Sequence, residues 1–136
     1  MNKVKQTFVT DILYDSQYKI LCDYVGKPDC ECSLDVPLPI DQNAEIGDTV
    51  YFRCLHYWYK GIVAKSFINQ IVESNVVEVR FSAIINPKRH SILSLSELEE
   101  ILPNKGWNDR HAHILLDTDE AQLLNSRWDL LIGKQY

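Results

Sequence analysis

The chain has 136 residues, of which 46% are hydrophobic and 24% are charged, and its formal net charge is −5. This length fits one domain, and the composition excludes a chain that stays disordered. The negative charge argues against a protein that coats nucleic acid or membrane by bulk electrostatics. We therefore expect one folded domain over residues 1–136.

The N-terminus leads into an alternating segment instead of a signal peptide, and no apolar run reaches the roughly 18 residues of a membrane helix. We expect a cytoplasmic protein with no membrane partner. Its cysteines, Cys22, Cys30, Cys32 and Cys54, should then be reduced and buried. A zinc site formed by Cys22, Cys30, Cys32 and His56 is an alternative. However, only one residue separates Cys30 from Cys32, which is unusual for a structural zinc site. We expect neither a metal nor a cofactor.

Charge is distributed unevenly along the chain. Residues 1–48 contain nine acidic and four basic residues. Residues 49–93 contain two acidic and six basic residues, and residues 94–136 contain eight acidic and four basic residues. A basic middle between two acidic ends indicates either a focused anion-facing surface or solvated strand faces without such a purpose.

Alternating side chains predict strands over Thr7–Tyr14 and Gln17–Val25, joined as an antiparallel hairpin by the turn residues Asp15-Ser16. A short strand is expected at Cys30–Val36. It is followed by Pro37-Leu38-Pro39, which must lie at a sheet edge or in a loop because two backbone donors are missing.

The strongest strand pattern begins at Val50. One face carries Val50, Phe52, Cys54, His56 and Trp58, and the other carries Tyr51, Arg53, Leu55, Tyr57 and Tyr59. Gly61 is expected to mark a turn or bulge before a strand over Ile62–Ile68. A last strand over Asn75–Ile85 should face inward through Val77, Val79, Phe81, Ala83 and Ile85.

The C-terminal third has helical spacing. Two capping pairs, Ser94 with Glu97 and Asp117 with Glu120, predict the start of two helices. Pro103 should stop the first helix and Gly133 the second. This order of elements predicts an α+β fold: a small, twisted, antiparallel β-barrel of five or six strands with two C-terminal helices.

No enzyme motif is present. The histidines fall in no recognised catalytic signature, and no glycine-rich phosphate loop occurs. His111 and His113 would share one face of a strand, where a surface pair is expected more than a metal site. We predict no catalytic residue, although a triad assembled from distant residues stays open as an alternative.

Aromatic and polar residues concentrate in two segments, residues 56–60 and residues 106–110, and these segments supply the candidate site. The candidate ligand-binding residues are Trp58, Tyr59, Trp107, Asn108 and Arg110. A flat ring beside an amide and a guanidinium can stack on a base and bond to its edge. Lys60 and Arg89 are candidate phosphate contacts. The alternative is structural, because Trp58 and Trp107 could instead belong to the core.

Three short motifs follow one another within residues 46–132. They are Ile46-Gly47-Asp48-Thr49-Val50-Tyr51-Phe52, then Gly61-Ile62-Val63-Ala64, then the turn from Leu102-Pro103 to Gly106-Trp107-Asn108. In this order they resemble the PUA-like superfamily, which includes the EVE and ASCH domains. The resemblance implies a single PUA-like β-barrel domain. It also implies a pocket between barrel and helices that holds a modified or flipped base, or RNA, near the candidate residues.

Two functions follow as hypotheses. The first is a non-enzymatic binding module that recognises a base, possibly a modified one, or a short nucleic-acid segment. The second is an acidic module of the immunity or antitoxin type that binds a basic protein partner through the acidic ends of the chain.

Overall fold

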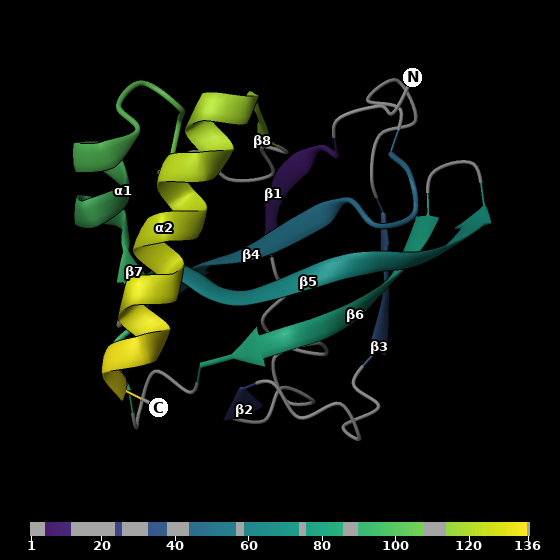
Figure 1. Ribbon diagram of the computed structural model, residues 1–136, viewed down its shortest axis with the longest axis horizontal. Helices are drawn as coiled ribbons and strands as arrows, with labels where there is room; N and C mark the ends of the chain where they lie inside the picture. The colour runs from purple at the N-terminus through teal and green to yellow at the C-terminus, as the bar shows by residue number, and fades with distance from the viewer. Residues whose placement is uncertain are drawn as a thin grey trace.

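The computed structural model describes residues 5–11, 24–25, 33–37, 44–56, 59–73, 76–85, 90–107 and 114–135 (Figure 1). The strands are β1 (Thr7–Asp11), β2 (Tyr24–Val25), β3 (Ser33–Pro37), β4 (Thr49–His56), β5 (Tyr59–Glu73), β6 (Val76–Ile84), β7 (Leu93–Ser94) and β8 (Ile114–Leu116). The helices are α1 (Leu95–Ile101) and α2 (Thr118–Gln135).

The described strands form one mixed sheet in the order β2-β6-β5-β4-β1-β8, with β3 also pairing with β6 and β7 with β5. β1 and β4 run parallel, and the other described pairs are antiparallel. The α+β class is therefore confirmed, whereas the all-antiparallel arrangement is wrong. Over the residues that the structure describes, the sheet does not close into a barrel.

The predicted N-terminal hairpin is wrong at its outer ends, and its turn at Asp15-Ser16 lies outside the described residues. β1 pairs with β4 on one side and with β8 on the other, while β2 pairs with β6 at the far end of the sheet. Phe8 and Val9 are both fully buried although they point to opposite faces. Burial on both faces is typical of an interior strand, which explains why β1 lies inside the sheet.

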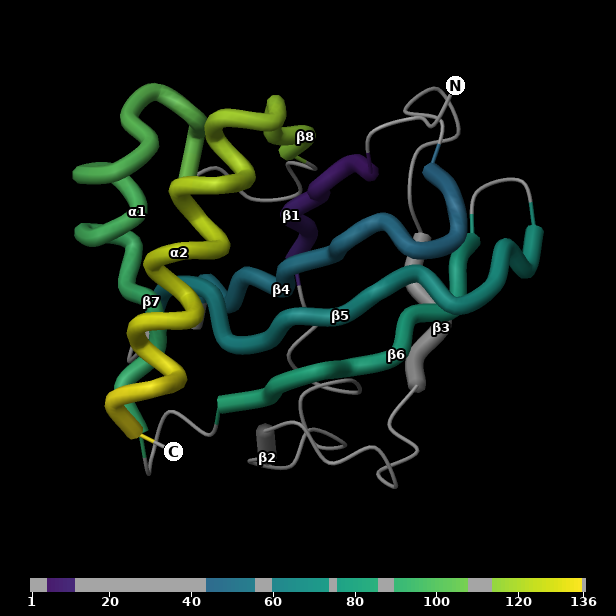
Figure 2. Tube along the Cα trace, viewed as in Figure 1, coloured from purple at the N-terminus to yellow at the C-terminus, as the bar shows by residue number. Residues whose placement is uncertain are grey.

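Two cores lie on the two faces of the sheet. The sheet core consists of Phe8, Val50, Phe52, Cys54, Val63, Ala64, Ile68, Val77, Val79, Phe81 and Ile84. The helix-side core consists of Val9, Tyr51, Ile62, Ala83, Ile85, Leu93, Leu95, Leu98, Leu102, Trp107, Ile114, Leu116, Leu124 and Trp128. Figures 1 and 2 show α2 crossing one end of the sheet, with α1 beside it.

The predicted inward residues of β6 are all buried, but they do not share one face. The pairing of β5 with β6 shifts register after Lys65, so that Ser82 is an extra residue. Such a bulge reverses the alternation of side chains. Phe81 consequently packs in the sheet core, and Ala83 in the helix-side core.

Both predicted helix starts are confirmed. The Glu97 amide donates to the Ser94 hydroxyl oxygen at 3.3 Å. Asp117 and Glu120 each accept the other's backbone N–H, at 2.8 and 3.0 Å. α1 ends at Ile101, two residues before Pro103, as predicted.

Gly133 does not end α2, which continues to Gln135. Glycine only weakens a helix interior unless the backbone there adopts a positive φ. None of the described helices is both long enough and apolar enough to span a membrane.

The Gly47-Asp48 motif has a local structural explanation. Gly47 has φ of +93°, and the buried Asp48 carboxylate accepts the backbone N–H groups of Gln6 at 2.9 Å and Glu45 at 2.8 Å. This carboxylate therefore fixes the start of β1 beside the start of β4.

Candidate functional site

Three distant parts of the chain meet at Arg53. This residue lies in β4 directly opposite Asp11, the last residue of β1. Its Nε donates a hydrogen bond to Asp11 Oδ1 at 2.6 Å. Its Nη1 donates to the carbonyl oxygens of Trp107 at 2.9 Å and Gly106 at 3.2 Å. We call these four residues the Arg53 network.

The Arg53 side chain is fully buried, while that of Asp11 is 20% exposed. Burying a guanidinium ion costs several kcal/mol of hydration free energy. An opposite charge and hydrogen bonds must offset this cost. Here the Asp11 carboxylate supplies the opposite charge, and two carbonyl oxygens accept further N–H groups. The network thus joins β1, β4 and the turn after α1 through one side chain.

Trp107 lies in the core, the structural alternative that its sequence position left open, and its ring is not exposed for stacking. Its side chain is fully buried in the helix-side core. The indole Nε1 donates to the carbonyl oxygen of Leu102 at 2.8 Å. The positive φ values of Asn104 (66°) and Gly106 (72°) belong to the turn that brings the ring back to the end of α1.

The other candidate residues are described only in part. Lys60 is exposed in β5 and is the register partner of Leu55. Tyr59 begins β5 opposite His56, and only its backbone is described. Both lie beside the end of β4, a few residues beyond Arg53. Trp58, Asn108, Arg110, Arg89, His111 and His113 lie outside the described residues, as do Cys22, Cys30 and Cys32.

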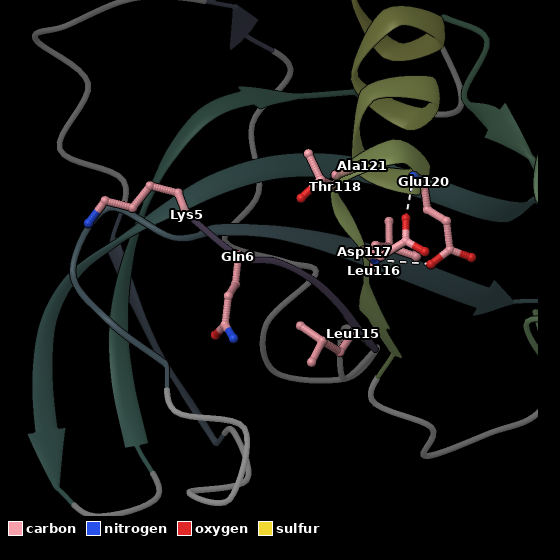
Figure 3. A pocket seen from close by; sticks show the side chains of 8 residues that line it. All are labelled: Lys5, Gln6, Leu115, Leu116, Asp117, Thr118, Glu120 and Ala121. Atoms are coloured by element: carbon pink, nitrogen blue, oxygen red, sulfur yellow. Dashed lines mark hydrogen bonds between the residues drawn. The ribbon is translucent and has the colours of Figure 1, made fainter. Parts of the chain in front are cut away.

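A pocket of about 390 Å³ lies at the opposite end of β1, between β8 and the first turn of α2 (Figure 3). Its lining residues are Lys5, Gln6, Leu115, Leu116, Asp117, Thr118, Glu120 and Ala121. The Asp117 and Glu120 carboxylates already accept the backbone N–H groups there. Because these two acids complement the helix dipole, the pocket is unsuited to an anion. None of its lining residues is one of the predicted site residues.

No protein-family model and no curated protein matches this chain. A solved structure is similar to this chain: a hypothetical protein from Leishmania major, with a TM-score of 0.64 and 12% sequence identity. The similarity covers 93% of this chain and 96% of that one. At this identity the similarity concerns the fold alone, and it extends over nearly the whole of both chains.

A second polar cluster, which was not predicted from the sequence, lies between the sheet and α2. The Tyr51 hydroxyl donates to Asn125 Oδ1. The Tyr51 and Trp128 rings pack in a T-shaped arrangement with their centroids 5.7 Å apart. Lys65 Nζ lies 5.6 Å from the centre of the Tyr51 ring. Strand alternation gave no signal for this cluster, because it depends on which helix covers the strand face.

Burial raises the pKa of Tyr51 well above that of an ordinary tyrosine, and the nearby charge of Asp129 acts in the same direction. Burial lowers the pKa of Lys65, while Asp129 partly opposes this shift. Tyr51 is thereby held neutral, as a hydrogen-bond donor.

This shift predicts a loss of stability at alkaline pH. Above about pH 10 the unfolded tyrosine ionises and the folded one does not, so the unfolded state binds fewer protons. The free energy of unfolding should fall with rising pH, relative to Tyr51→Phe, by roughly 1 kcal/mol per pH unit. Urea unfolding of both proteins over an alkaline pH series measures this. Parallel pH profiles would contradict it.

Proposed function

We propose that this chain is a non-enzymatic binding module that holds a base, possibly a modified one, or a short nucleic-acid segment at the ends of β1 and β4. The Arg53 network is the observation that carries the proposal. It joins the sheet to the turn that leads to Asn108. The PUA-like resemblance implies a pocket between these same two parts of the fold.

The burial of Trp107 changes the roles within the proposed site. Stacking on a base passes to Trp58 or Tyr59, at the junction of β4 and β5 in the sequence. Asn108 and Arg110 would bond the edge of the base, since an amide and a guanidinium offer paired donors or acceptors. Lys60, which is exposed, and Arg89 would contact phosphate.

Trp58→Ala tests the stacking role. It should weaken the binding of short single-stranded oligonucleotides, with and without modified bases, by about 1 to 3 kcal/mol. The melting temperature should change little. Fluorescence anisotropy at low salt measures the affinity. If the wild-type chain binds none of these oligonucleotides, the proposed function fails.

The salt dependence tests the phosphate contacts. Lys60→Ala should make the slope of log affinity against log salt shallower by about 0.7 to 0.9, because one fewer counterion is released. Lys134→Ala is the matched control, since it removes the same charge from an exposed position near the end of α2. Equal slopes for both variants would remove Lys60 from the site.

The protein-partner function remains the alternative, supported by exposed acids on both helices. Glu99 and Glu100 are exposed in α1, and Asp119 and Asp129 in α2. In that case charge reversal at Glu99 and Glu100 would slow association with a basic protein, while oligonucleotides would not bind.

A further inference from the structure

The apolar surroundings of Arg53 do not require a charged side chain. Its neighbours on the same sheet face, Val9, Tyr51 and Ile62, all belong to the helix-side core. Replacing a buried ion pair by apolar residues of similar volume often leaves stability unchanged or raises it. The distinctive contribution of Arg53 is therefore its hydrogen bonds to the carbonyl oxygens of Gly106 and Trp107.

We infer that Arg53, neutralised by Asp11, is a positioning residue that fixes the Gly106–Trp107 turn relative to the ends of β1 and β4. Its contacts cross 42 residues to Asp11 and 53 and 54 residues to Gly106 and Trp107. A planar guanidinium bonds in fixed directions. The two carbonyl groups are therefore constrained in orientation as well as in distance.

Both the side chain and the backbone of Trp107 are fixed by hydrogen bonds. Its indole N–H is bonded to Leu102, and its carbonyl oxygen is bonded to Arg53. A peptide carbonyl lies in one rigid plane with the next amide nitrogen. Fixing the Trp107 carbonyl therefore also fixes the plane of the peptide bond that joins Trp107 to Asn108. The consequence for ligand binding rests on the function proposed above.

A double substitution separates positioning from stability. Arg53→Met with Asp11→Leu removes both charges and keeps an apolar side chain at the buried position. The reporter of the turn is hydrogen exchange of the Trp107 indole N–H, followed by NMR. The reference is exchange of backbone amides in the middle of α2. Arg80→Met, at an exposed position of β6, is the matched control for losing an arginine from the sheet.

We expect the double variant to fold and to keep wild-type exchange in α2. Its Trp107 indole should exchange about tenfold faster, because the carbonyl contacts that hold the turn are gone. Oligonucleotide affinity should fall severalfold, and Arg80→Met should leave indole exchange unchanged. Arg53→Lys should give intermediate exchange, since it keeps the charge opposite Asp11 but lacks the fork. If the double variant does not fold, Arg53→Lys carries the test alone.

Wild-type indole protection in the double variant would overturn the inference. Lost protection together with unchanged oligonucleotide affinity would leave Arg53 as the residue that holds the turn and would remove the consequence for ligand binding. If the wild-type chain binds no oligonucleotide, the proposed function fails by itself. The exchange measurement still decides whether Arg53 holds the turn.

Discussion

Trp107→Ala should lower the free energy of unfolding by about 3 to 5 kcal/mol, the usual range for deleting a large buried aromatic side chain. The indole is fully buried among residues of α1, α2 and the sheet. Its removal leaves a cavity and also leaves the Leu102 carbonyl without the Nε1 donor. Chemical denaturation of the purified protein measures this loss.

Two further variants separate the contributions to this loss. Trp107→Phe keeps most of the ring but loses the donor, so it should cost about 1 to 3 kcal/mol. Leu123→Ala removes apolar atoms from a side chain in α2 that is 52% exposed, and should stay within about 0.5 kcal/mol of wild type. A small stability loss in Trp107→Ala, accompanied by lost oligonucleotide binding, would return the ring to a stacking role.

The local elements of this fold were predictable because their signals are local. Period-two alternation located β4 and β6, and both capping pairs lie at the helix starts. A capping box needs only residues three positions apart. Helix ends were less certain: proline stopped α1, whereas Gly133 continues within α2.

Strand partners were not predictable from the same signals. The turn residues Asp15-Ser16 suggested a hairpin, yet β1 lies between β4 and β8. Adjacent Phe8 and Val9 are both apolar, which already indicated burial on both faces. That signal conflicts with a simple alternating hairpin, but it does not identify the strand on either side.

The candidate site was predictable in part. The residues around Trp107 stood out in the sequence, where its ring fitted either a binding role or a core role. The structure places the ring in the core. Arg53 was assigned correctly to the face opposite Phe52, but not to the site. Its partners are 42 to 54 residues away, and no local pattern carries such contacts.

Gly61→Ala should destabilise the protein by about 2 to 4 kcal/mol, through backbone strain and overpacking. Gly61 has φ of +155°, and a Cβ there would lie 2.1 Å from the carbonyl oxygen of Leu93 and 2.9 Å from Cα of Ser94. Both contacts are with backbone, so β7 itself would have to move away from β5.

The expected damage reaches α1, because Ser94 is the residue that caps it. NMR shifts of α1 amides should therefore change along with the urea midpoint. Gly133→Ala is the matched control: outside the adjoining helix backbone and chain neighbours, no heavy atom lies within 4 Å of the added Cβ. In a helix the change should stabilise by about 0.5 to 1 kcal/mol. If both substitutions were neutral, the positive φ of Gly61 and the close approach of β5 to β7 would both be contradicted, since these two features distinguish Gly61 from Gly133.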